Sequence, residues 1–169
     1  MSRLFVAVWP PDEVAEELRA LRRKDQRGIR FVPPENWHIT LRFLGSADPD
    51  AVAGALDAAD LPGASAHLDA GVDLLFDRIL AIPVDGLTEL TGAVESATAG
   101  LGTEGPRRRF TGHLTIARCR KGAMMPPALG TLVRGSFPVT EIALVESRLR
   151  PTGAQYQTVA SWPTVGNPG

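Results

Sequence analysis

Two short segments of the chain combine a histidine and a threonine at the same spacing. His38 lies two residues before Thr40, and His113 lies two residues before Thr115. An imidazole gains and loses its proton near neutral pH, so a facing pair can act as general base and general acid. A threonine hydroxyl can donate a hydrogen bond to a phosphate oxygen. Two such units suit in-line displacement at a phosphodiester, with the attacking and leaving oxygens on opposite sides of phosphorus.

The repetition of the pattern carries this interpretation. A single His-x-Thr segment is weak evidence, because an isolated histidine on a strand is more often a structural or surface residue. The third histidine, His67, has no comparable neighbours, and we assign it no role. The three histidines and the single cysteine show no metal-ligand spacing, so the sequence predicts neither a metal nor a cofactor.

Both segments are predicted to be strands, because β-branched and aliphatic residues alternate with polar ones. Alternation places His38 and Thr40 on one face and extends that face to Arg42, which we expect to contact phosphate. The same rule puts Arg118 on the face opposite His113, where it could form a salt bridge instead.

The two strands are predicted within a mixed order of elements. Apolar spacing, helix-start signals and turn residues mark the elements. The expected strands are 4–9, 38–44, 66–76, 78–84, 113–119, 139–150 and 155–162, and the expected helices are 10–24, 48–60, one from about 86 and a short one from 126. This order favours an α+β fold with antiparallel pairing over a doubly wound parallel sheet. The motifs lie 75 residues apart, each after a helix, which indicates a two-lobed duplication within one domain over 1–169, with the motif strands facing each other across a cleft.

The composition is that of an ordinary globular protein, with 44% hydrophobic and 22% charged residues. No apolar run has membrane-spanning length, and residues 4–8 are too few for a signal peptide, so no membrane association is expected. The single cysteine, Cys119, excludes an internal disulfide, fits a reducing cytoplasm and is expected to be a small packed residue. The lone tyrosine, Tyr156, has no predicted place.

The net charge of −1 conceals a segregation of charge along the chain. Residues 46–104 carry one basic and eleven acidic side chains, whereas residues 105–169 carry nine basic and two acidic ones. Basic clusters at 19–30 and 107–109 lie shortly before the two motifs. They are either ordinary solvated surface or a positive rim around a phosphate site, and the sequence leaves both interpretations open.

Longer stretches around the motifs resemble the 2H phosphoesterase superfamily and, more closely, the RNA 2′,3′-cyclic phosphodiesterase family, also called the 2′-5′ RNA ligase family. The resemblance rests on the motif segments 36–45 and 110–118, on the opening strand 3–8, and on the closing hairpin 146–163. One departure is Gly112, which stands where the family usually has proline. Glycine lacks the fixed φ of proline and could loosen the start of the second motif strand.

The resemblance implies a bilobal fold with a pseudo-twofold cleft and a metal-free reaction. The implied reaction hydrolyses RNA 2′,3′-cyclic phosphate ends to 2′-phosphomonoesters. In family terms His38 is the proton donor and His113 the proton acceptor, while Thr40 and Thr115 hold the nonbridging phosphate oxygens. The sequence by itself does not separate the two histidine roles.

Two alternatives remain open. A 2′-5′ RNA ligase could use the same acid and base in the opposite direction, because microscopic reversibility applies to both. A non-catalytic protein that binds RNA ends or nucleotides could keep the same cleft, although loss of a motif histidine would favour it and both are present. The expected partners are RNA with 2′,3′-cyclic phosphate ends or cyclic nucleotides, and the expected state is a monomer.

Overall fold

The computed structural model describes residues 1–106 and 109–166, so Arg107 and Arg108 of the second basic cluster lie outside the described residues. The helices are α1 (Asp12–Arg19), α2 (Pro49–Asp57) and α3 (Thr88–Ala97), with a 3₁₀ turn at Pro34–Asn36. The strands are β1 (Ser2–Val8), β2 (Ile29–Phe31), β3 (Ile39–Ala47), β4 (Ala64–His67), β5 (Ala70–Gly71), β6 (Asp73–Leu75), β7 (Ile79–Pro83), β8 (His113–Cys119), β9 (Leu132–Val133), β10 (Ser136–Val139), β11 (Glu141–Arg150) and β12 (Gly153–Pro163). The expected α+β fold with antiparallel pairing is confirmed.

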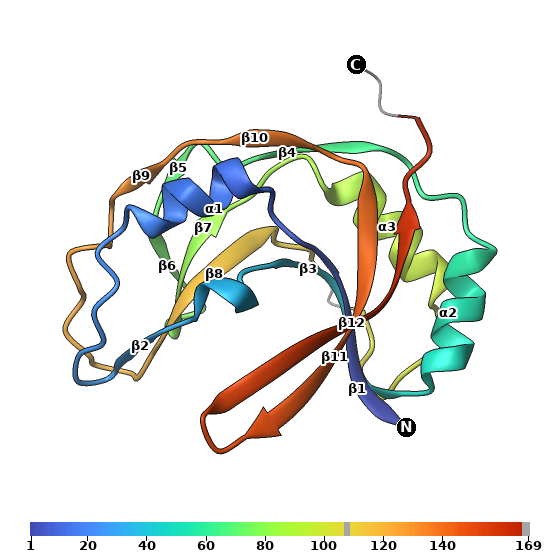
Figure 1. Cartoon of the computed structure of the whole chain (residues 1–169), viewed down its shortest axis with the longest axis horizontal. Coiled ribbons are helices and arrows are strands. Elements are labelled where there is room, and N and C mark those ends of the chain that lie inside the picture. Colours follow the sequence, from blue (N-terminus) through green and yellow to red (C-terminus); the bar gives the residue numbers. More distant parts are fainter. Residues whose placement is uncertain (107–108, 167–169) are drawn as a thin grey trace.

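One antiparallel sheet runs through the whole molecule. Its strand order is β12-β11-β1-β3-β8-β7-β6, and β2 pairs with β8 off this path. The two motif strands, β3 and β8, are neighbours at its centre. In Figure 1 the long β11–β12 hairpin and the ends of β2 and β8 reach down as two arms, while α1, α2 and α3 lie on the other side of the sheet. The arrangement therefore leaves one face of the motif strands uncovered by helices.

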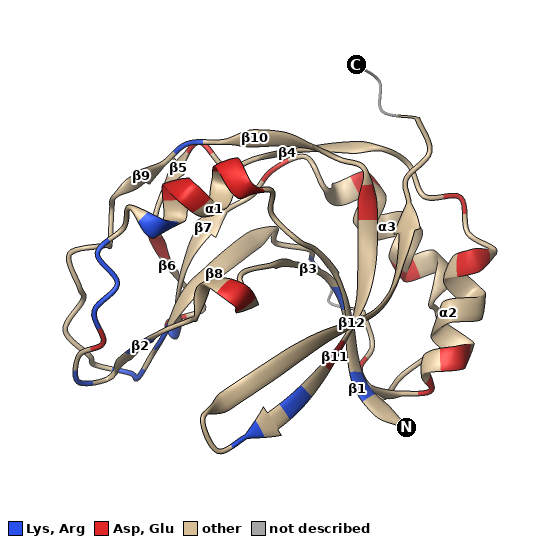
Figure 2. Cartoon of the chain, in the orientation of Figure 1, with Lys and Arg blue, Asp and Glu red and all other residues tan. Residues whose placement is uncertain are grey.

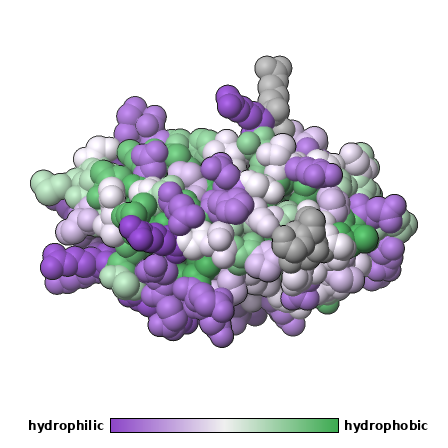
Figure 3. All heavy atoms as spheres, turned by 90° about the horizontal axis from the view of Figure 1, so that it is seen from above, coloured by the Kyte–Doolittle hydropathy of each residue, from purple (hydrophilic) through white to green (hydrophobic). Residues whose placement is uncertain are grey.

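The helices and the sheet share one large core. β1 shows how it forms, because Leu4, Val6 and Val8 join the main cluster whereas Phe5 and Ala7 belong to a smaller cluster on the opposite face. Each helix adds apolar residues at helical spacing to the main cluster: Val14 and Leu18, Val52 and Leu56, Leu90 and Val94. On the face seen from above in Figure 3, hydrophobic and hydrophilic residues are mixed and the hydrophobic areas are small. Among the described residues, no helix combines the length and apolar character that a membrane span requires.

Three predicted elements differ from the structure. Helix α1 ends at Arg19 rather than near residue 24, because Leu21 turns back into the core. Residues 66–76 do not form one strand: β4 pairs with β10, β5 pairs with β9, and only β6 pairs with β7. Pro126 begins a turn and not a helix, since a single bond from the Leu129 N–H to its carbonyl closes it. The tight connection at Asp77 is confirmed, with left-handed φ values at Phe76 and Asp77.

Both motif strands carry a β-bulge at the same motif position. On β3, Thr40 lies opposite Ala7 and Arg42 lies opposite Val6, so Leu41 is an extra residue. On β8, Thr115 lies opposite Ala81 and Ala117 lies opposite Leu80, so Ile116 is the extra residue. An extra residue shifts the side chains that follow it to the other face of the strand. Alternation therefore holds up to each threonine and reverses after it, until a second extra residue, Leu44, interrupts β3 again.

The start of β8 depends on a close approach between two backbones. The Val84 N–H donates a hydrogen bond to the Gly112 carbonyl over 2.8 Å. A Cβ atom at Gly112 would overlap the carbonyl oxygen of Val84. Gly112 thus allows the backbone of Val84, just after β7, to bond to the residue before His113. The ring of a proline at this position would collide with the Val84 carbonyl oxygen. The glycine ties the start of the strand down instead of loosening it.

We expect Gly112→Ala to destabilise the fold by about 1–3 kcal/mol, because the new methyl group must push two backbones apart. Gly54→Ala in α2 is the matched control: nothing lies within 4 Å of the added Cβ, and alanine favours a helix by about 0.5–1 kcal/mol. Urea unfolding of both variants measures the difference. A Gly112→Ala protein as stable as the wild type would contradict the proposed packing.

Candidate active site

The two motifs meet at their middle residues. Ile39 of β3 lies directly opposite Leu114 of β8. Antiparallel geometry then sets each histidine beside the threonine of the other motif, with all four polar side chains on the face away from Ile39 and Leu114. A cleft of about 420 Å³ opens on this face, and its lining includes His38, Thr40, His113 and Thr115. The structure therefore brings together the four residues that the sequence singled out.

The backbone fixes the same ring orientation in both histidines. Nδ1 of His38 lies 2.8 Å from the Asn36 carbonyl oxygen, and Nδ1 of His113 lies 2.7 Å from the Thr111 carbonyl oxygen. A carbonyl only accepts hydrogen bonds, so each Nδ1 is the protonated donor. Each Nε2 is then the nitrogen available for proton transfer in the cleft. In His38 that atom lies 3.0 Å from the Thr40 hydroxyl oxygen.

Aromatic rings surround His38. The ring centres of Phe5, Tyr156 and Trp9 lie 4.8, 5.3 and 5.9 Å from that of the imidazole. This assigns a place to Tyr156, for which the sequence predicted none. Burial lowers the pKa of His38 from its ordinary 6.5 to about 4, and the bond to the Asn36 carbonyl opposes this shift only in part.

Positive charge on His113 and Arg118 contributes a smaller part of the same lowering of the His38 pKa. At neutral pH the imidazole of His38 in this cleft is therefore uncharged, with a lone pair on Nε2. Nearby negative charge would reverse part of this effect, because it stabilises the imidazolium form. The protonation state of His38 thus depends on what occupies the cleft.

The bulges exchange the predicted positions of two arginines. The prediction that Arg42 shares the face of His38 is wrong, because the extra residue Leu41 turns Arg42 to the other face of β3. Arg42 is only 4% exposed, and its guanidinium donates to the Thr98 hydroxyl and the Leu101 carbonyl at the end of α3. Burial lowers the pKa of the Arg42 guanidinium, and Glu95 partly offsets this. The side chain joins α3 to the sheet.

The predicted face of Arg118 is also wrong, in the opposite direction to that of Arg42. The sequence placed it away from His113, but Ile116 is the extra residue of β8, and Arg118 therefore lines the cleft with both motifs. In the described part of the chain it forms no salt bridge. Phe43, which stands at the corresponding position of the first motif, lines the cleft as well. No residue type near either bulge indicates that a bulge is present. Simple alternation therefore could not predict that Arg118 and Phe43 line the cleft.

Two further residues lie near the cleft, one expected and one missed. Cys119 packs against the main core as expected, and burial raises the pKa of its thiol. Phe76 was missed: it is 50% exposed, has a left-handed φ of 54°, and its ring centre lies 5.7 Å from that of His113. Its position in a turn gave no signal that its ring would lie beside His113. The described residues contain no group of three His, Cys, Asp or Glu side chains that could hold a metal ion.

The family model described as LigT-like phosphoesterase matches residues 8–68, a stretch that includes the first of the two histidine–threonine pairs in the cleft. The RNA 2′,3′-cyclic phosphodiesterase of Thermus thermophilus is 32% identical over 191 residues, covering 99% of this chain and 92% of that protein. The enzyme of the same name from Geobacillus stearothermophilus is 31% identical over 185 residues, and the match covers 99% of this chain but only 59% of that protein.

Solved structures agree with these relatives. E. coli LigT in complex with 3′-AMP superposes with a TM-score of 0.77 and 26% sequence identity, covering 98% of this chain and 99% of that one. The chain belongs to the RNA 2′,3′-cyclic phosphodiesterase family.

The low pKa of His38 predicts how stability depends on pH. The unfolded chain binds a proton at His38 below about pH 6.5, whereas the folded chain binds it only near pH 4. Acid therefore favours the unfolded state through this residue, and His38→Gln removes that contribution. We expect the stability of the wild type relative to His38→Gln to fall as the pH decreases from 6.5 toward 4, measured by urea unfolding. An NMR titration of the imidazole provides an independent check, and a midpoint near 6.5 in the empty protein would contradict the burial argument.

Proposed function

We propose that this protein hydrolyses 2′,3′-cyclic phosphate ends of RNA to 2′-phosphomonoesters, using two histidines and no metal. The observation that carries the proposal is the meeting of the two motifs at Ile39 and Leu114, which directs two imidazole Nε2 atoms into one cleft. The names of the relatives support this substrate, and the 3′-AMP complex of E. coli LigT supports a nucleotide as the ligand. The single cysteine fits a cytoplasmic protein, and we expect a monomer.

The reaction requires one proton to be removed and one to be supplied. His113 takes a proton from the attacking water, whose oxygen forms the new bond to phosphorus. The bond from phosphorus to the 3′-oxygen breaks, and His38 gives that oxygen a proton. The product keeps the phosphate on the 2′-oxygen. The hydroxyls of Thr40 and Thr115 donate to the two nonbridging oxygens, and for Thr40 a phosphate oxygen replaces the imidazole of His38 as partner.

The donor role of His38 depends on the substrate. An uncharged imidazole cannot donate a proton from Nε2 when its only N–H is on Nδ1. The negative charge of a bound phosphate raises the pKa of His38 and so promotes uptake of the proton that the reaction uses. Arg118 lines the cleft with both motifs, and we propose that its guanidinium binds the phosphate. Arg42 lines a smaller cavity with Thr40 and His113, and its contact with phosphate stays a prediction.

Neither alternative has an observation that favours it over hydrolysis. A ligase would use the same histidines and the same phosphate site, and identification of the product separates it from a hydrolase. Incubation with 2′,3′-cyclic AMP and with a cyclic-ended oligonucleotide, followed by ³¹P NMR of the products, provides this test. A simple binding protein would leave both compounds unchanged, and a 3′-phosphate product would reject the proposed leaving group.

We expect His38→Ala and His113→Ala each to lower kcat by about 10²–10⁴-fold, because each removes one proton-transfer group. The kcat of the double variant should be only slightly below that of the less active single variant, since the two residues act as a unit. Thr40→Val and Thr115→Val should cost about 1–3 kcal/mol each in transition-state binding. His67→Ala is the control, because His67 lies on β4 and outside the cleft.

Steady-state hydrolysis of 2′,3′-cyclic AMP measures these effects, in buffer with excess EDTA. Near-normal turnover by either histidine variant would reject the two-histidine mechanism. An EDTA-inactivated wild type that only a divalent ion restores would reject the metal-free one.

The exchanged arginines predict opposite effects. We expect Arg118→Gln to lower kcat/KM by about 10–100-fold at unchanged stability, because it removes a charged group that binds phosphate and no packing. Arg42→Gln should mainly lower stability, by about 1–3 kcal/mol, because it removes the bonds to Thr98 and Leu101. Kinetics and thermal unfolding of both variants test this pair. A stable but inactive Arg42→Gln protein would show that Arg42 serves the reaction after all.

A further inference from the structure

Arg118 belongs to two adjoining cavities. One is the active-site cleft, and the other is a concavity of about 580 Å³ beside it, over β2 and the end of β8. Arg30 and Arg120 also line the second cavity. A concave surface therefore continues from the two motifs past Arg118 and out of the cleft. We call the second cavity the arginine groove.

Two arginines of the groove face each other across strands. Arg30 of β2 lies directly opposite Arg118 of β8, so their side chains share one face of the sheet. Like charges in this arrangement repel and destabilise a sheet. Within the described residues, neither of them, nor Arg120, forms a salt bridge. All three are exposed, so the protein holds unneutralised positive charge at the mouth of the cleft.

The acidic side chain of the groove offsets only part of this charge. Asp25 also lines it, but one of its carboxylate oxygens accepts a hydrogen bond from the Phe31 N–H at 2.7 Å. That bond fixes the loop before β2. One carboxylate faces three guanidinium groups, so the groove has an excess of positive charge and suits an anionic ligand.

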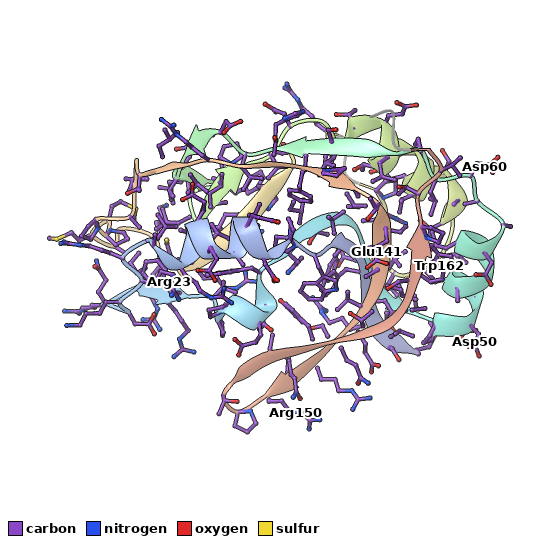
Figure 4. The ribbon with its side chains drawn as sticks, turned by 45° about the horizontal axis from the view of Figure 1, so that its top comes forward. Arg23, Asp50, Asp60, Glu141, Arg150 and Trp162 are labelled. Atoms are coloured by element: carbon purple, nitrogen blue, oxygen red, sulfur yellow. The ribbon has the colours of Figure 1, made fainter. Side chains whose placement is uncertain are left out.

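The arginines of the opposite arm have partners. On the β11–β12 hairpin, Arg148 forms a salt bridge with Glu146 at 3.2 Å, and Arg150 donates to the Gln155 side chain at 3.2 Å. Basic residues colour both arms in Figure 2, and Figure 4 labels Arg150 at the end of the hairpin. Both arms thus carry basic residues, but the arginines of the hairpin have side-chain partners that offset or bind their guanidinium groups. Over residues 1–106 and 109–166, the arm whose arginines form no salt bridge is the one built from β2 and β8.

Distance separates the arginine groove from the catalytic phosphate. Arg120 lies five residues beyond Thr115, which corresponds to about 16 Å along an extended strand. A cyclic mononucleotide has a single phosphate, and Thr115 would hold it. It cannot reach Arg120 with a second anionic group. A chain of nucleotides carries one phosphate per residue and can reach it.

We propose that the arginine groove binds the phosphodiester groups that precede the cyclic end, so that Arg30 and Arg120 select oligonucleotides over cyclic mononucleotides. This inference rests on the proposed function and adds to it a subsite, a direction for the chain and a preference for length. The last nucleotide lies over the two motifs, and the preceding phosphates pass Arg118 toward Arg30 and Arg120. The contacts are ionic and carry no base preference.

The test compares two substrates, 2′,3′-cyclic AMP and a tetranucleotide with a 2′,3′-cyclic phosphate end. The variants are Arg30→Gln, Arg120→Gln and the double variant, and Arg134→Gln between β9 and β10 is the control. We expect the double variant to lower kcat/KM for the tetranucleotide on the order of tenfold and to leave that for cyclic AMP within twofold. The salt dependence for the tetranucleotide should also weaken, by a slope of about 0.7 for each phosphate that the variant no longer binds.

An unchanged rate on the tetranucleotide, or an equal loss on both substrates, would overturn the subsite. A wild type that hydrolyses neither substrate would instead reject the proposed function. Binding then still tests the groove: fluorescence anisotropy of the labelled tetranucleotide should show about tenfold weaker affinity for the double variant than for Arg134→Gln. Equal affinities of these two variants would reject the arginine groove as a binding site.

Discussion

The site depends on one contact between strands, the pair Ile39 and Leu114. These residues are the middle positions of the two motifs, and their side chains are fully buried. Burial of this apolar pair on one face directs the polar members of both motifs to the other face. A slip of β3 against β8 by one residue would send the histidine of one motif into the core. The apolar positions of the motifs are therefore as necessary to the site as the polar ones.

The bulges allow the same strands to contribute both to the core and to the cleft. Before each bulge the strand presents a histidine and a threonine to the cleft, and after it the strand presents Phe43 or Arg118. In between, two consecutive residues are buried, Leu41 with Arg42 on β3 and Ile116 with Ala117 on β8. A regular strand cannot bury two neighbours on one side. The extra residue thus lets the core and the cleft share a short segment.

The sequence predicted correctly those features of the site and fold that depend on local residue patterns. The spacing of His38, Thr40, His113 and Thr115 predicted their common face because no bulge separates the members of each pair. The assignments failed at Arg42 and Arg118 because Leu41 and Ile116 are ordinary strand formers, and a bulge arises from pairing with β1 and β7 rather than from residue type. The fold class followed from element order. The division of segment 66–76 into separate strands could not be predicted from element order, because two of these strands pair with residues 132–139, which are distant in the sequence.

In the empty protein His38 carries no charge, whereas Arg118 brings a positive charge to the same cleft. The rings of Phe5, Trp9 and Tyr156 surround His38, and burial together with nearby positive charge keeps its imidazole neutral in the empty protein. An anion that enters the cleft stabilises the protonated form, so substrate binding and proton uptake are linked, and each favours the other by the same free energy. In the proposed reaction this proton is the one delivered to the leaving oxygen. An anionic phosphodiester in the cleft therefore favours the charged acid, and a neutral ligand of the same shape would leave His38 uncharged.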